Sequence, residues 1–225
     1  MRRLLPLVAL LAVACVGTSE PASGDVRSCA ARPYSYAGFA AAQPASGVSA
    51  TVTALSAPQV LNGHVAAWVG VGGPGAGPGG SDEWVQVGLS SFADGENGRL
   101  YFELALPNQQ PRYVEVDANV APGESHRLTV LEIGSRPSWW RVWIDGRPVT
   151  QPIDLPRSHN RWRPIATAES WNAGTAVCNA FAYRFGNVAA AAAGKWITFA
   201  RGYRFQDPGY RAVADSSTTF RALGN

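Results

Sequence analysis

The fold prediction for this chain starts from residues 83–89, which are Glu83-Trp84-Val85-Gln86-Val87-Gly88-Leu89. Apolar residues alternate with other residues here, and a period of two is typical of a β-strand with one buried face. Val85, Val87 and Leu89 therefore point into a core. The opposite face carries Trp84 and Gln86. Because an amide beside a large aromatic ring is an unusual solvent-facing surface, Gln86 is a candidate functional residue.

Alternating segments recur along the chain and are separated by Gly, Pro, Asn or Asp. They span residues 48–54, 65–71, 84–89, 100–106, 113–117, 126–133, 139–144, 147–153, 165–171, 181–185, 196–199 and 216–223. Asp145-Gly146 follows one of them and is a strong β-hairpin signal. The alanine run at 188–193 is helical by propensity, or else a small-residue strand or crossover. Because no long segment has helical periodicity, we predict an all-β sandwich or barrel.

The N-terminus has the features of a secretory signal peptide. Arg2 and Arg3 are followed by an uncharged apolar run that is too short to span a bilayer. We expect cleavage after Ala14. Residues 12–15 also resemble a bacterial lipobox, so the alternatives at Cys15 are lipidation and ordinary cleavage before it. The protein would be secreted, periplasmic or at the cell surface, with membrane contact only through the lipid anchor.

The remaining chain suits one domain. Residues 15–32 are small, polar and Pro/Gly-bearing, as in a linker, and residues 33–225 form the expected β-sandwich domain. With Cys15 lipidated or unpaired, Cys29 and Cys178 make an even pair. An exported chain folds in an oxidising compartment, so we predict a disulfide between them. The alternative is two buried free thiols.

Charge and motifs exclude several function classes. The chain carries 19 Lys and Arg against 16 Asp and Glu, and removal of the signal lowers its formal charge from +3 to +1. A nearly neutral chain gives no electrostatic case for nucleic acid binding. There is no Gly-x-Ser-x-Gly and no His-Glu-x-x-His. The histidines His64, His126 and His159 are scattered, so we expect no metal site and assign them structural or surface roles.

Strand phase places a set of aromatic and polar residues on the faces that point away from the core. They are Trp68, Trp84 with Gln86, Tyr101 with Glu103, and Glu169 with Trp171. If the sheet curves, this face is concave and can hold an extended ligand. Aromatic rings with a few carboxylates and an amide suit a peptide and a sugar chain equally well. The alternative is a polar sheet face that is wetted by solvent.

Short motifs on these strands occur in a fixed order. They are Tyr36-Ala37-Gly38, Val48-Ser49-Ala50-Thr51-Val52-Thr53, Trp68-Val69-Gly70-Val71-Gly72-Gly73, Val85-Gln86-Val87-Gly88-Leu89, Tyr101-Phe102-Glu103, Ala168-Glu169-Ser170-Trp171 and Phe185-Gly186-Asn187-Val188. The series resembles that of the glutamic peptidases, the eqolisin family, over nearly all of the chain after the signal. In one departure, Val71-Gly72-Gly73 replaces the family's Ile-Asp-Gly.

The resemblance implies a concanavalin-like, jelly-roll sandwich of two packed antiparallel sheets. It also implies an endopeptidase that works at acid pH, with Glu169 as general base and acid and Gln86 as the oxyanion donor. Trp68, Trp84, Tyr101, Glu103 and Trp171 would bind a polypeptide substrate. No cofactor is required, and we expect a monomer. The alternatives are a non-catalytic domain and a carbohydrate-binding or glycan-active domain that takes a polysaccharide, since one fold hosts many functions.

Overall fold

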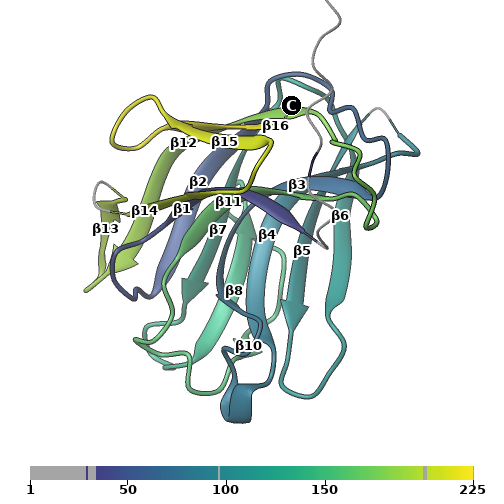
Figure 1. Cartoon of the computed structure of the whole chain (residues 1–225). Helices are drawn as coiled ribbons and strands as arrows, with labels where there is room; N and C mark the ends of the chain where they lie inside the picture. Colours follow the sequence, from purple (N-terminus) through teal and green to yellow (C-terminus); the bar gives the residue numbers. More distant parts are fainter. Residues whose placement is uncertain (1–28, 30–33, 96, 200–201, 225) are drawn as a thin grey trace, which may run out of the picture.

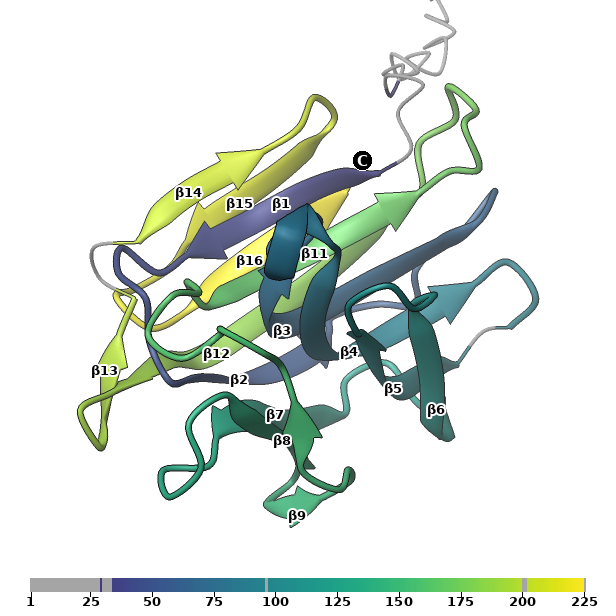
Figure 2. The ribbon, with the colours of Figure 1, turned by 90° about the horizontal axis from the view of Figure 1, so that it is seen from below.

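The computed structural model describes residue 29 and residues 34–95, 97–199 and 202–224. These residues form two antiparallel β-sheets that pack face to face, so the predicted all-β sandwich is confirmed. Figures 1 and 2 show the two layers, with β14 and β15 at one edge of the molecule and β6 at the other. Within the described part of the chain, the one helical element is a single turn, η1 (Pro78–Gly80). No helix among the described residues is long and apolar enough to cross a membrane.

The first sheet has seven strands in the order β14-β1-β11-β3-β4-β5-β6. Their bounds are β1 Ser35–Ala40, β3 His64–Gly73, β4 Glu83–Phe92, β5 Gly98–Ala105, β6 Arg112–Val120, β11 Ile165–Trp171 and β14 Tyr203–Gln206. Strands β3 and β4 form the centre of this sheet. The segment at 83–89, from which the fold was predicted, therefore lies within a central strand.

The second sheet has nine strands, seven of them in the order β10-β8-β7-β2-β12-β16-β15. The other two, β9 and β13, pair with β8 and β12. Their bounds are β2 Gly47–Ala54, β7 Ser125–Glu132, β8 Trp139–Ile144, β9 Arg147–Pro148, β10 Ile153–Asp154, β12 Phe181–Ala192, β13 Lys195–Thr198, β15 Tyr210–Ala214 and β16 Phe220–Gly224. The Asp145-Gly146 turn joins β8 to β9, and both residues have positive φ, as a tight hairpin requires.

The core fills the space between the sheets. Val85, Val87 and Leu89 of β4 are at most 2% exposed, as their alternation predicts. Small residues of β11, namely Ala166 and Ala168, are also fully buried against the second sheet. Because one face of the first sheet is used for this core, the side chains of opposite phase point away from it. This outer face holds the candidate site.

The structure decides two further predictions, one on the alanine run and one on the disulfide. The alanine run at 188–193 is mostly strand rather than helix, since Ala189–Ala191 pair with both β2 and β13. Tertiary pairing thus overrides the helical propensity of alanine. Cys29 and Cys178 form the predicted disulfide, with their Cα atoms 5.2 Å apart. The predicted signal peptide and the lipidation site at Cys15 lie outside the described residues.

Candidate functional site

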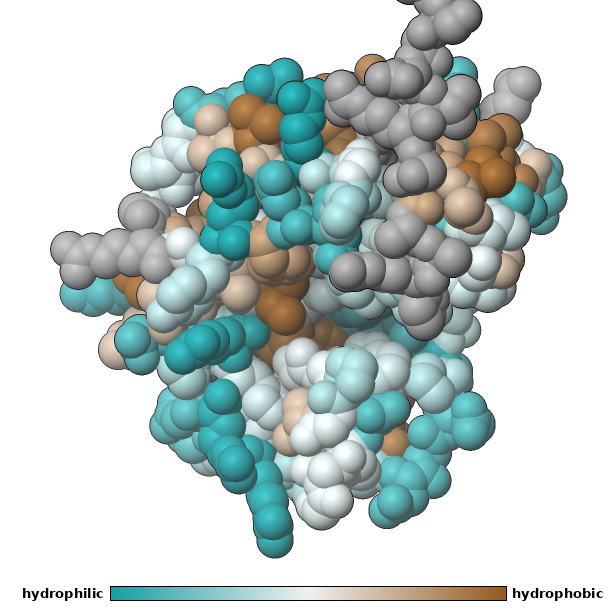
Figure 3. Space-filling view, in the orientation of Figure 1, coloured by the Kyte–Doolittle hydropathy of each residue, from teal (hydrophilic) through white to brown (hydrophobic). Residues whose placement is uncertain are grey.

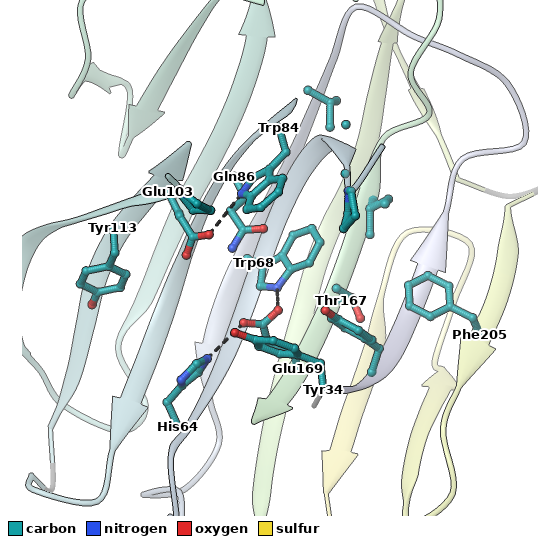
Figure 4. A pocket seen from close by; sticks show the side chains of 17 residues that line it. Tyr34, His64, Trp68, Trp84, Gln86, Glu103, Tyr113, Thr167, Glu169 and Phe205 are labelled. Atoms are coloured by element: carbon teal, nitrogen blue, oxygen red, sulfur yellow. Dashed lines mark hydrogen bonds and ion pairs between the residues drawn. The ribbon is translucent and has the colours of Figure 1, made fainter. Parts of the chain in front are cut away.

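A cavity of about 650 Å³ opens on the outer face of the first sheet. Figure 3 shows a face of the molecule that is hollowed near its centre, where apolar residues are visible. Figure 4 shows the side chains around the cavity. The lining residues are Tyr34, Tyr36, His64, Trp68, Val71, Gly72, Gly73, Pro74, Trp84, Gln86, Glu103, Pro111, Tyr113, Ile165, Thr167, Glu169 and Phe205.

Small residues on the central strand β3 make room for this cavity. Ala66 is paired with Glu169 on one neighbouring strand, and Gly70 is paired with Gln86 on the other. A Cβ atom at Gly70 would lie only 2.8 Å from the Cβ of Gln86. Only Trp68, between these two small residues, carries a large side chain. The glutamine of β4 and the glutamate of β11 can therefore both face the space above β3.

Both carboxylate oxygens of Glu169 have hydrogen-bond partners. The indole N–H of Trp68 donates to Oε2 at 2.8 Å, and the His64 imidazole Nε2 lies 3.4 Å from Oε1. Figure 4 shows the carboxylate between these two side chains. Glu169 is only 7% exposed, so the indole donor offsets part of the cost of burying its charge. The carboxylate is fixed in orientation and still faces the cavity.

His64 lies within a group of aromatic rings at one end of the cavity. The rings of Phe92 and Trp171 have their centroids 5.6 Å from that of His64, and the ring of Tyr34 lies at 6.1 Å. Sequence reasoning assigned His64 a structural or surface role and did not predict its contact with Glu169. The available signal was strand phase, because His64 and Trp68 fall on the same face of β3.

The side-chain amide of Gln86 is held by a hydrogen bond to a tyrosine. Its Nε2 donates to the hydroxyl of Tyr101 at 3.4 Å, and the Tyr101 ring stacks on that of Tyr113 with centroids 4.9 Å apart. Ser90 in turn lies 2.9 Å from the Tyr113 hydroxyl. A primary amide carries two N–H groups, so Gln86 retains one donor beyond the bond to Tyr101. In Figure 4 the Gln86 amide lies between Trp84 and Trp68.

A second carboxylate, Glu103, lies beside Gln86. The two residues are directly paired across β4 and β5, and Tyr113 is paired with Glu103 on its other side. The indole N–H of Trp84 donates to Glu103 Oε1 at 3.2 Å. Burial and the nearby negative charge of Glu169 raise the pKa of Glu103, and the Trp84 hydrogen bond partly opposes them. Burial and the charge of Glu169 likewise raise the pKa of Tyr36.

The structure brings most of the predicted site residues together. Gln86, Glu169, Trp68, Trp84 and Glu103 line one cavity. Tyr101 and Trp171, predicted to bind substrate, are not among its lining residues. Tyr101 is 2% exposed because it packs beneath Gln86 and Tyr113, and Trp171 lies at the end of β11, beside His64. The lining residues that were not predicted include Tyr34, Tyr36, Tyr113, Thr167 and Phe205.

The chemistry of the cavity is that of carboxylates, an amide and aromatic rings. No Lys or Arg is among the described residues that line it. Among the described residues, no group of three or more His, Cys, Asp or Glu side chains could hold a metal ion. The arrangement offers two carboxylates, one amide N–H of Gln86 beyond its bond to Tyr101 that can stabilise negative charge, and flat apolar walls for a ligand.

The fold resembles that of solved glutamic peptidases. Scytalido-glutamic peptidase, in complex with a peptide-based transition state analogue, matches with a TM-score of 0.61 and 17% identity, over 85% of this chain and 98% of that one. SCP-B, an eqolisin solved with the tripeptide Ala-Ile-His, matches with a TM-score of 0.57 and 15% identity over the same shares.

A carbohydrate-binding module is a more distant structural match. The carbohydrate-binding module CBM66 from Bacillus subtilis matches with a TM-score of 0.38 and 9% identity, over 69% of this chain and 80% of that one, a likeness too low to support an inference. No protein-family model matches the sequence, and no curated protein matches it. The chain therefore has the fold of the glutamic peptidases.

Proposed function

We propose that this protein is an endopeptidase that hydrolyses peptide bonds with Glu169 and Gln86. The observation that carries the proposal is that both residues line one cavity on a fold shared with glutamic peptidases. Among the described residues that line the cavity there is no Ser, Cys or Lys, and the one threonine, Thr167, is fully buried and donates its hydroxyl to the Ala168 carbonyl. Attack by a water molecule is therefore the chemistry that the residues support best.

Glu169 would act on that water. An ionised carboxylate accepts a proton from the attacking water as general base, and the resulting acid then protonates the leaving amine. Oε2 accepts the short bond from Trp68 at 2.8 Å, whereas Oε1 has only the longer 3.4 Å contact with His64, so Oε1 would be the oxygen for proton transfer. Because the carboxylate must begin the cycle ionised and end it ionised, no other proton donor is required.

Gln86 would stabilise the tetrahedral intermediate. Its second N–H is available to the developing oxyanion, because the first is directed to Tyr101. A neutral amide that is already oriented costs no charge burial and little reorganisation during the reaction. Removal of one such donor costs about 100- to 1,000-fold in kcat in enzymes of this general kind. Tyr101 therefore acts as a positioning residue, although it does not line the cavity.

The proposal is tested by incubating the mature protein with denatured protein and with fluorogenic peptides across pH 2–8. Glu169→Gln and Gln86→Ala are compared with Glu115→Gln, which removes a glutamate charge from β6 outside the cavity. We expect cleavage by wild type and the control variant only, with an optimum at acid pH. Equal cleavage by all four proteins, or no cleavage by any, would refute the catalytic assignment.

One observation favours a second candidate, a glycan-active enzyme. Glu103 and Glu169 line the same cavity, and the charge of Glu169 helps to raise the pKa of Glu103. Two carboxyl groups that face one cavity are the arrangement used in glycoside hydrolysis, where one acts as acid and the other as base or nucleophile. In that case the protein would cleave a polysaccharide, and Glu103→Gln would abolish the activity. If peptide and glycan assays are both negative, the protein is a non-catalytic domain.

The proposal includes export and a monomeric enzyme that needs no cofactor. The Cys29–Cys178 disulfide supports an oxidising compartment. Cleavage of the predicted signal after Ala14, lipidation of Cys15, and a single domain over residues 33–225 belong to the same proposal. Mass spectrometry of the mature protein from its membrane and soluble fractions tests these points, since a diacylglycerol on Cys15 adds a characteristic mass.

A further inference from the structure

The row formed by Gln86, Glu103 and Tyr113 defines a place for one substrate side chain. These residues are directly paired on neighbouring strands, so their side chains project side by side from the sheet. Gln86 is the proposed oxyanion donor. A side chain that lies over Glu103 must therefore belong to a substrate residue close to the bond being cleaved.

Glu103 has an unused hydrogen-bond acceptor in this row. Its Oε1 accepts the indole N–H of Trp84, and no hydrogen bond from a described residue reaches Oε2. The negative charge of Glu169 disfavours the ionised form of Glu103, and the His64 imidazole opposes this effect. Among the described residues that line the cavity there is no Lys or Arg, so no described lysine or arginine of the lining pairs with this carboxylate. A cation supplied by the substrate would offset both the cost of burying the Glu103 carboxylate and its repulsion by Glu169.

The walls of the row suit an extended cationic side chain. The flat rings of Trp84 and Tyr113 lie on the two sides of Glu103 in Figure 4. Tyr113 is 38% exposed, so one face of its ring is open to a ligand while Tyr101 stacks on the other. Aromatic faces attract a Lys or Arg head group and also pack against its apolar stem.

We propose that Glu103, Trp84 and Tyr113 form a specificity pocket for a lysine or arginine side chain adjacent to the scissile bond. This inference rests on the proposed peptidase function and names its substrate preference. The charged head group would hydrogen-bond to Glu103 Oε2, and its stem would lie between the two rings. A neutral side chain of the same length would fill the space but leave the Glu103 carboxylate without a counter-ion.

The test uses paired peptides that differ at one position, with lysine in one and norleucine in the other, moved one residue at a time through the cleaved sequence. We expect kcat/KM to favour the lysine peptide by about 10- to 100-fold at one position next to the cleaved bond. In Glu103→Gln this ratio should fall close to one. In Glu115→Gln, which removes a charge from the neighbouring strand outside the cavity, the ratio should not change.

A binding measurement separates failure of this inference from failure of the peptidase assignment. The same peptides are titrated into Glu169→Gln and into the double variant Glu169→Gln, Glu103→Gln, with binding followed by calorimetry at pH 6. Tighter binding of the lysine peptide, lost in the double variant, supports the pocket even if wild type cleaves nothing. Equal binding of the two peptides, no binding of either, or a preference that survives Glu103→Gln would overturn it.

Discussion

Glu83 provides the sharpest prediction about stability. It begins β4 and is 0% exposed, and neither of its carboxylate oxygens has a hydrogen-bond partner among the residues that the structure describes. The loop between β3 and β4 covers it, since a Cβ at Gly77 in that loop would lie 2.9 Å from Glu83 Oε2. Burial, with a smaller contribution from the negative charge of Asp154, raises the pKa of Glu83 from 4.5 to about 7. The folded protein therefore favours the protonated form.

The sign of the pH dependence follows from this shift. Below pH 4.5 the side chain is protonated in both the folded and unfolded states, and its contribution to stability is fully present. Between 4.5 and about 7 the unfolded state loses the proton first, so stability falls as pH rises and then levels off. Each pKa unit is worth about 1.4 kcal/mol. The loss is then at most about 3 kcal/mol, because opening of the loop can rehydrate the carboxylate.

Glu83→Gln should remove this loss. The amide leaves its own donors unpaired and carries a cost that is similar at every pH, so the informative quantity is the difference between two pH values. We compare the free energy of unfolding of the variant with that of wild type at each pH. From pH 4 to pH 8 this difference should shift in favour of the variant by up to about 3 kcal/mol, or roughly 6–12 °C in Tm. Asp154→Asn should give a smaller change of the same sign. Urea unfolding at both pH values measures this.

The reasoning about Glu83 fails if Glu83→Gln changes stability equally at pH 4 and pH 8. That result would mean that Glu83 is as easily ionised in the folded protein as in the unfolded chain. The exposed Glu115→Gln serves as the control, since its carboxylate reaches solvent beside Arg99. Its pH-dependent difference should stay within about 0.5 kcal/mol, as for most surface substitutions.

Three further predictions concern the frame of the site. Reduction of Cys29–Cys178 should cost about 2–5 kcal/mol in urea unfolding, because the bond closes a loop of 149 residues, and no loss would contradict that estimate. Trp68→Phe should lower kcat about 10- to 100-fold, since Glu169 loses its indole donor. Circular dichroism should show an intact fold, and an unchanged kcat would exclude this role of Trp68. Gly88→Ala should destabilise the protein by about 1–3 kcal/mol, because its Cβ would meet backbone and ring atoms at 2.7–2.8 Å, and a neutral result would refute the close packing.

Much of the fold follows from a period of two in the sequence. Alternation identifies which face of β4 and β11 is buried because it depends only on local geometry, and the structure confirms both phases. Alternation is weak in β14, which is an edge strand with mostly exposed residues. That strand is formed by backbone pairing with β1, which no local pattern encodes. The short strand β15 was missed as well.

The site was predictable only in part, because it also depends on pairing between strands that are distant in the sequence. Phase places Gln86, Glu169 and His64 on outer faces, but which residues meet depends on strand order and register. Register pairs Trp171 with His64 at the end of the cavity rather than within it. It also pairs Tyr101 with Gly88, whose missing side chain lets the tyrosine ring pack low against the sheet. Neither pairing can be predicted from the sequence of one strand alone.

The central claim is that Glu169 and Gln86 act as one catalytic unit on a peptide bond. The most direct measurement is kcat and KM for one fluorogenic peptide with wild type, Glu169→Gln, Gln86→Ala and the double variant. We predict that each single variant loses at least about 100-fold in kcat with little change in KM. The double variant should lose little more than Glu169→Gln alone, since the two act on the same transition state. Full activity in either single variant would contradict the account.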